Sequence, residues 1–193
     1  MSDVHSVAVF CGSRPGGNPA WMTGARDFGK ALAGAGMRLV YGGGRTGMMG
    51  AVADGALAGG GTVLGVIPEF LKQLEVAHEG VSEMIVTDSM HSRKRRMFEL
   101  ADAFVCLPGG LGTFDETMEI ITWRQLKLHD KPIVLVDLEG AYGPLVASIE
   151  GAIVQGFAPS WTRQLFEVTT DVAGTIERLK HLATARGGAV ALL

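Results

Sequence analysis

The sequence has few cysteines, little excess charge and no long apolar run, and each shortage excludes a class of protein. Cys11 and Cys106 are the only two cysteines among 193 residues, too few for a disulfide framework and typical of a reducing compartment. The formal net charge of −3 provides no electrostatic footprint for nucleic acid or for an anionic membrane. No apolar run approaches the ~20 residues of a membrane span, and Asp3 and His5 do not fit the start of a signal peptide. We therefore expect a cytoplasmic protein that binds neither nucleic acid nor membranes.

Motifs for metal binding and for a serine nucleophile are also missing. The two cysteines lie far apart in the sequence, and the histidines show no metal-ligand spacing; they are His5, His78, His91, His129 and His181. No nucleophile elbow of the Ser-His-Asp hydrolases is present. We therefore expect no metal site and look for the chemistry elsewhere.

Short apolar runs alternate with longer helical stretches along the whole chain. The runs predict strands at 7–10, 38–41, 62–67, 84–87, 103–107, 132–136 and 165–168, and helices at 19–35, 48–58, 90–100, 113–128, 145–155 and 170–182. Continuously apolar strands between helices are typical of a parallel sheet covered on both faces. The expected fold is α/β, a single Rossmann-like domain over residues 1–186 with a doubly wound parallel sheet. Residues 187–193 form a tail that is frayed or docks on a partner subunit.

Glycine is abundant, at 28 positions, and it gathers where three predicted strands end. The glycine-rich loops span 12–17, 42–47 and 108–113, and each leads into a predicted helix. Ligands of parallel sheets bind at the carboxyl ends of the strands, and helix N-termini favour anions. Three such loops on one edge predict a phosphorylated ligand of mononucleotide size. From the first two loops, the candidate contacts are Gly12, Ser13, Gly43 and Gly44.

The second loop also fits a dinucleotide-binding pattern. Gly42, Gly44 and Gly47 have the required spacing, and Glu69 lies about where a ribose-binding acid is expected. The loop, however, follows the second predicted strand rather than the first. We therefore do not favour NAD or NADP, and no cofactor is expected.

An acidic candidate follows the third loop. Thr113 and Glu116 fit a capping box, in which the threonine caps the helix and the glutamate bonds back. Capping is the role of Glu116 that the spacing alone favours. The same placement also sets a carboxylate above an anion-binding helix end, where it can stabilise positive charge on a ribose or activate a water.

A basic candidate lies in the run 91–97, which contains four consecutive basic residues. Such a run is usually a solvated helix face. On a helix, however, Met90, Arg93 and Met97 share one face. If that face meets the cleft, the two methionines flank a base and Arg93 reaches phosphate or substrate.

Taken together, these motifs resemble the LONELY GUY family of cytokinin riboside 5′-monophosphate phosphoribohydrolases. Residues 108–116, PGGLGTFDE, are similar to the PGGxGTxxE motif of that family, and matching segments at 41–50 and 90–94 accompany it. The matches run from about residue 7 to 157. The resemblance implies hydrolysis of a purine nucleoside 5′-monophosphate substituted at N6 to free base and ribose 5-phosphate, without a cofactor, in a homodimer.

The resemblance also implies roles for individual residues. Arg93 and Glu116 correspond to the catalytic pair, so that Glu116 is expected to combine catalysis with capping. The implied nucleotide contacts are Glu75, Lys94, Gly110, Leu111, Gly112, Thr113, Phe114, Asp115 and Thr122.

Three other functions remain open on this scaffold. A general AMP or nucleotide nucleosidase would share every motif, because selectivity at N6 depends on the shape of the pocket. A non-enzymatic carrier of a nucleotide or of molybdenum cofactor would share the fold but has no need of Arg93 with Glu116. Proteins with this motif are also labelled lysine decarboxylases, which implies pyridoxal phosphate on a lysine; Lys94 is the lysine nearest the expected cleft.

Overall fold

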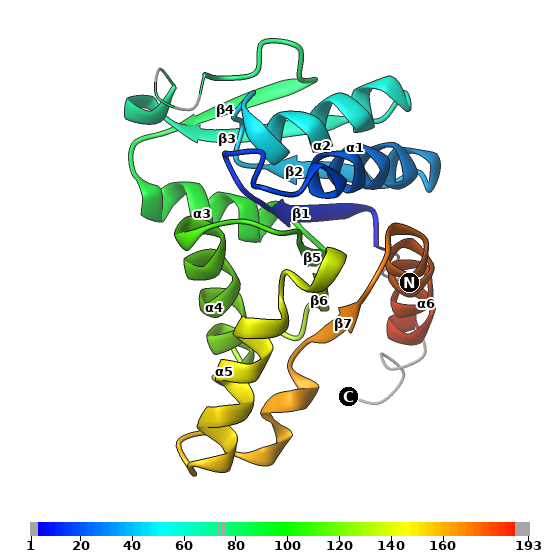
Figure 1. The fold of residues 1–193 in the computed structure, drawn as a ribbon. Helices are drawn as coiled ribbons and strands as arrows, with labels where there is room; N and C mark the ends of the chain where they lie inside the picture. Colours follow the sequence, from blue (N-terminus) through cyan, green and yellow to red (C-terminus); the bar gives the residue numbers. More distant parts are fainter. Residues whose placement is uncertain (1–3, 73, 75, 188–193) are drawn as a thin grey trace.

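The computed structural model describes residues 4–72, 74 and 76–187. Seven parallel strands form one sheet in the order β4-β3-β2-β1-β5-β6-β7 (Figure 1). They are β1 (Ser6–Phe10), β2 (Arg38–Tyr41), β3 (Val63–Pro68), β4 (Glu83–Thr87), β5 (Ala103–Cys106), β6 (Ile133–Val136) and β7 (Glu167–Thr169). The strand order changes direction at β1, which pairs with both β2 and β5. This is the switch point at which such sheets bind ligands.

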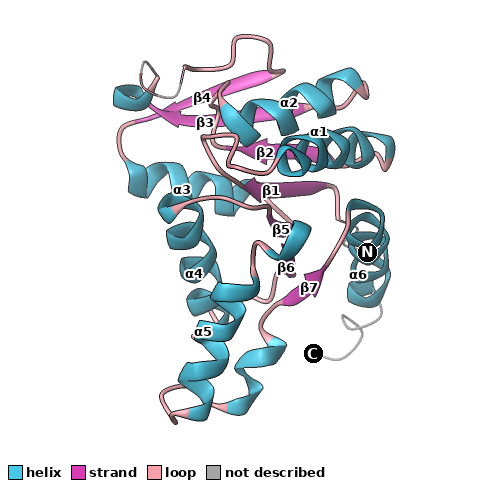
Figure 2. Cartoon of the chain, in the orientation of Figure 1, coloured by secondary structure: helices cyan, strands magenta, loops and turns pink. Residues whose placement is uncertain are grey.

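Helices cover both faces of the sheet (Figure 2). One layer contains α1 (Pro19–Gly34), α2 (Gly47–Ala58) and α6 (Val172–Gly187), and the other contains α3 (Met90–Leu100), α4 (Leu111–Gln125) and α5 (Gly143–Val154). Alternate residues of β1 enter the two cores, because successive strand side chains point to opposite faces. Val7 and Val9 pack beneath α1 and α2, whereas Ala8 and Phe10 pack on the α3 and α4 side.

The predicted doubly wound parallel sheet is confirmed, with helix and strand bounds displaced by a few residues. The sequence did not predict three short 3-10 turns, Glu69–Leu71, Leu138–Gly140 and Ser160–Gln164. Of the predicted tail at 187–193, Gly187 is the last residue of α6, and the remainder lies outside the described residues.

The predicted capping box at the start of α4 is wrong. The helix begins at Leu111, with Gly110 as its N-cap, and no side chain caps it. Thr113 is therefore the third helical residue, and Glu116 lies in the second turn. The structure does contain a capping box at α3, where Ser89 and Ser92 exchange hydrogen bonds.

Candidate active site

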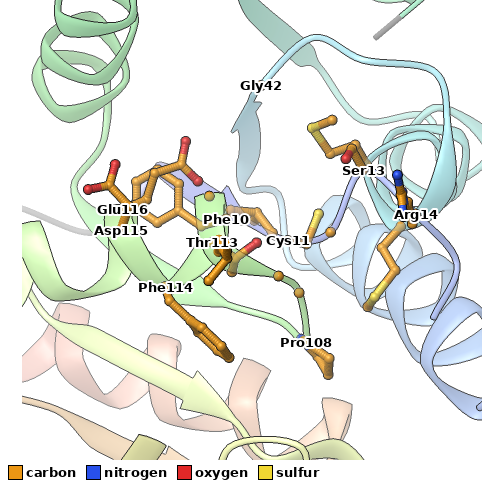
Figure 3. Close-up of a pocket in the computed structure, with 18 of the residues that line it drawn as sticks. Phe10, Cys11, Ser13, Arg14, Gly42, Pro108, Thr113, Phe114, Asp115 and Glu116 are labelled. Carbon is orange, nitrogen blue, oxygen red and sulfur yellow. The ribbon is translucent and has the colours of Figure 1, made fainter. Parts of the chain in front are cut away.

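A cavity of about 660 Å³ lies at the switch point, beyond the carboxyl ends of β1, β2 and β5 (Figure 3). The loops after β1 and β5, one face of α3 and the first turns of α4 supply much of its wall, and the remainder includes residues of β1, α1, α2 and the segment before α5. Most of the residues that the sequence predicted line it, namely Gly12, Ser13, Met90, Arg93, Met97, Gly110, Leu111, Gly112, Thr113, Phe114, Asp115 and Glu116. The structure thus brings the first and third glycine loops together with one face of α3.

The two loops are held against each other by backbone hydrogen bonds. Gly12 N–H donates to the Pro108 carbonyl at 3.1 Å, and Leu107 N–H donates to the Phe10 carbonyl at 2.9 Å. A Cβ atom on Gly109 would lie 2.1 Å from Thr113 Oγ1 and 2.8 Å from Gly12 N. Glycine is required at 109 because only a residue without a side chain permits this close approach.

The start of α4 offers backbone donors to the cavity. The first helical hydrogen bond of α4 runs from Phe114 N–H to the Gly110 carbonyl at 3.0 Å. The N–H groups of residues 111–113 therefore have no partner within the helix. Since the helix dipole is also positive at this end, the N-terminus of α4 is suited to an anion such as phosphate.

Arg93 is buried at the base of the cavity, with 4% of its surface exposed. Its Nε donates to the Val66 carbonyl at 3.1 Å, and its Nη2 donates to the Gly42 carbonyl at 2.7 Å. A Cβ atom on Gly42 would lie 2.1 Å from that Nη2. The guanidinium is therefore held at the ends of β2 and β3 in a single orientation.

Glu116 is half-buried and enters the cavity from the second turn of α4. Figure 3 shows its carboxylate and that of Asp115 across the cavity from Ser13 and Arg14. The charge of Glu116 also acts on the core beneath α4. The pKa of Cys106 is raised to about 12, chiefly by burial; a Thr117 hydrogen bond opposes this rise, and the Glu116 charge adds to it.

Several predicted contacts do not line the cavity. Lys94 Nζ is 3.2 Å from an Asp115 oxygen and 3.0 Å from a Glu119 oxygen, so that it joins α3 to α4. Thr122 is exposed on α4, outside the lining. Gly43 and Gly44 pair instead with the segment after β3, as shown by the 2.9 Å bond from His78 N–H to the Gly43 carbonyl. Glu75 lies outside the described residues.

Other residues line the cavity without having been predicted. Trp21 comes from α1, where its indole N–H donates to the Leu138 carbonyl at 3.1 Å. Tyr142 precedes α5, and Arg14 lies in the first glycine loop. Two features of the sequence could have identified Arg14 as a lining residue, namely its place in the first glycine loop and its positive charge. Trp21 and Tyr142 carried none, because they reach the cavity only through contacts between distant segments.

Metal clusters and membrane-spanning helices are both missing from the described part of the chain. The described residues contain no group of three or more histidine, cysteine, aspartate or glutamate residues able to hold a metal ion. No helix within the described part of the chain is long and apolar enough to cross a membrane.

A doubly wound parallel sheet with glycine loops around a cavity at its switch point defines a Rossmann-like α/β protein with a candidate anion-binding site. A family model described as possible lysine decarboxylase matches residues 49–179, about two thirds of the chain. This chain belongs to that family, which it shares with the cytokinin riboside 5′-monophosphate phosphoribohydrolases.

The similarity to those enzymes covers most of both chains. The cytokinin riboside 5′-monophosphate phosphoribohydrolase of Rhodococcoides fascians is 47% identical over 176 residues, which are 91% of this chain and 89% of the relative. An Arabidopsis thaliana enzyme of the same name is 37% identical over 182 residues, 94% of this chain and 85% of the relative. Among solved structures, the molybdenum cofactor binding protein of Rippkaea orientalis has a TM-score of 0.70 and 21% identity, covering 94% of this chain and 99% of that chain. The similarity to the Rippkaea orientalis structure shows only that the two chains share a fold.

Proposed function

We propose that this chain hydrolyses the N-glycosidic bond of N6-substituted adenosine 5′-monophosphates, releasing the free base and ribose 5-phosphate. The observation that carries the proposal is that Glu116 and Arg93 line one cavity with the uncapped N-terminus of α4. The names of relatives that are 37–47% identical support the same reaction.

The cavity supplies the parts that this reaction needs. The 5′-phosphate binds at the N-terminus of α4, and this contact, remote from the reacting bond, positions the ribose. As the bond from C1′ to the base nitrogen breaks, the ribose gains oxocarbenium character, which the Glu116 carboxylate stabilises while it orients a water. The water oxygen bonds to C1′ and the water loses one proton, while the departing base keeps the bonding electron pair and takes up one proton, so that the sum is addition of water across the bond. Arg93, which donates hydrogen bonds to two backbone carbonyls, forms a fixed part of the cavity wall against which the substrate binds.

The lysine decarboxylase description of the family does not fit this cavity. Pyridoxal phosphate chemistry requires a lysine that reaches the bound cofactor. No lysine lines the cavity in the part of the chain that the structure describes, and Lys94 is committed to Asp115 and Glu119. The residues present therefore argue against that chemistry.

We also propose that the protein is a cytoplasmic homodimer whose interface covers α4 and α5. Ile149 is the only buried residue of α5, a largely apolar helix, and Val154 and Phe157 are 81% and 84% exposed. On α4, Leu111 is 87% exposed beside the cavity. The family resemblance implies that Thr122 contacts the nucleotide. In the structure, Thr122 lies two helical turns from Asp115 and outside the cavity of its own chain. A second copy seated on this face would cover the apolar residues and would leave Thr122 able to meet the other copy's substrate.

Chromatography of purified protein incubated separately with isopentenyladenosine monophosphate, AMP and isopentenyladenosine tests the activity. Release of base from the first, faster than from AMP and absent with the riboside, is the expected result. Comparable release from AMP would instead assign a general nucleotide nucleosidase. Nucleotide binding without any release would assign a carrier and would overturn the proposal.

A further inference from the structure

Arg14 differs from Arg93 and from the nearby Lys94 in that its side chain has no partner among the residues that the structure describes. Arg93 is bound to two backbone carbonyls, and Lys94 to two carboxylates. The exposed guanidinium of Arg14 lines the cavity and makes no hydrogen bond or ion pair with any residue that the structure describes. An arginine in such a position is available to a ligand.

The backbone that carries Arg14 is held by several contacts, although its side chain has no partner within the described part of the chain. Thr46 Oγ1 donates to the Ser13 carbonyl at 3.1 Å, and Met49 N–H donates to the Gly12 carbonyl at 3.2 Å. A Cβ atom on Gly47 would lie 2.4 Å from Arg14 N, so that the start of α2 presses directly against this loop. The position from which the guanidinium extends is therefore set by the fold and does not depend on the ligand.

The charges of the residues that line the cavity favour phosphate binding by the Arg14 guanidinium. The charged residues of the lining, among those that the structure describes, are Arg14, Arg93, Asp115 and Glu116. A phosphate that enters beside two carboxylates needs compensating positive charge, which the N-terminus of α4 supplies only in part. Figure 3 places Arg14 across the cavity from both carboxylates, so a phosphate bound near Arg14 would be kept away from Asp115 and Glu116.

The loop that carries Arg14 also adjoins the anion-binding end of α4. Gly12, two residues before Arg14, donates to the Pro108 carbonyl, and a Cβ atom on Gly12 would lie 3.3 Å from Gly109 Cα. We propose that Arg14 binds the 5′-phosphate of the substrate and selects nucleotides over unphosphorylated ribosides. The proposal rests on the proposed function for the identity of the substrate. Arginine suits this task because its planar guanidinium matches two phosphate oxygens at once.

The test compares Arg14→Ala and Arg14→Lys with the wild-type protein. Arg26→Ala is the matched control, because Arg26 is an exposed arginine of α1 outside the cavity lining. For Arg14→Ala we expect the KM of isopentenyladenosine monophosphate to rise about tenfold, the loss typical of a hydrogen bond to a charged group. Its kcat should stay within about twofold, because substrate and transition state bind the same phosphate. The KM of Arg14→Lys should lie between those of the wild type and Arg14→Ala, and the KM of Arg26→Ala should match that of the wild type.

Calorimetric titration with AMP, adenosine and inorganic phosphate provides a readout that does not depend on turnover. Loss of AMP and phosphate affinity with unchanged adenosine affinity supports the proposal. Unchanged AMP affinity in Arg14→Ala, or equal losses for AMP and adenosine, would overturn it. If the wild-type protein cleaves no monophosphate, the proposed function fails, but the titration still decides the role of Arg14.

Discussion

The hydroxyl of Tyr142 donates a 2.9 Å hydrogen bond to the carbonyl of Leu107, the residue that directly precedes the glycine loop of the cavity. Leu107 N–H is bound in turn to the Phe10 carbonyl, so that this residue is held on both sides. Burial raises the pKa of Tyr142 well above its ordinary value, so the hydroxyl stays protonated and remains a donor. A residue 35 positions away thereby supports the loop that carries the candidate anion site.

Replacing Tyr142 by phenylalanine should therefore affect both stability and nucleotide binding. Loss of the hydroxyl leaves the Leu107 carbonyl without this donor, and we expect the free energy of unfolding to fall by about 1 kcal/mol. The KM for the nucleotide should rise because the loop is less well held. Tyr41→Phe is the matched control, because the buried Tyr41 hydroxyl has no hydrogen-bond partner among the described residues. Urea denaturation of both variants checks the prediction, and equal losses of stability would contradict it.

Glu116→Gln should remove turnover and leave folding and nucleotide binding intact. The amide keeps the size of the side chain but cannot stabilise positive charge on the ribose or accept a proton. We expect kcat to fall by about 100-fold or more, measured by release of free base. Glu177→Gln, on the distant helix α6, should retain full activity. Full turnover by a folded Glu116→Gln protein would show that the assignment is wrong.

Arg93→Lys should lose both stability and activity, although the charge is kept. A single ammonium group cannot reproduce the fork that binds the carbonyls of Val66 and Gly42. We expect the free energy of unfolding to fall by about 1–3 kcal/mol, since a buried carbonyl is left unsatisfied. Arg95→Lys, at an exposed arginine of the same helix, should change it by less than about 0.5 kcal/mol. Thermal unfolding and base release measured on both variants decide the matter.

His129 should make the fold less stable in mild acid. Lys131 N–H donates to its Nδ1, so that Nε2 carries the proton and donates to the Ile120 carbonyl. Burial, with the charges of Arg124 and Lys131, lowers the pKa of His129 below its ordinary 6.5. The unfolded chain therefore takes up a proton at a higher pH than the folded one, and this part of the stability is lost as the pH falls below 6.5. Urea midpoints of the wild type and His129→Gln at pH 7.5 and 5.5 test this, and an equal pH dependence in both would refute it.

The proposed dimer predicts that a charge on its apolar face produces monomers. Phe157→Asp and Val154→Asp place a carboxylate where apolar surface would be buried, so association should weaken. Light scattering should give about twice 20.3 kDa for the wild type and a single chain mass for the variants. Val86→Asp, an equally drastic change at an exposed valine of β4, should leave the wild-type mass unchanged. Wild-type protein that is monomeric at micromolar concentration would exclude the dimer.

The fold and the general place of the cavity could be predicted from local features of the sequence. Continuous apolar runs such as 133–136 are typical of strands buried on both faces, and they alternate regularly with helical segments. Glycine-rich loops after the first and fifth strands lie at the same edge when the sheet is parallel, because the carboxyl ends of all its strands share that edge. The spacing of Met90, Arg93 and Met97 likewise predicted that these residues share one face of α3, because helical periodicity is a local property.

Features that depend on contacts between distant segments could not be predicted in this way. The spacing of Thr113 and Glu116 suggested a capping box, but α4 begins two residues earlier, where Gly110 and its neighbours pass closely against the first loop. Lys94 was expected at the ligand, yet it lies within reach of two carboxylates on α4.

By itself, then, the sequence determined the order of strands and helices, the glycine loops and membership of the family, because each depends on residues close together along the chain. Only the tertiary structure decided which side chains share the cavity. Trp21 and Leu138 are 117 residues apart, and their hydrogen bond forms only once α1 packs beside the connection between β6 and α5. The availability of the Arg14 guanidinium is likewise a tertiary property, since it depends on none of the described residues around it providing a partner in the folded chain.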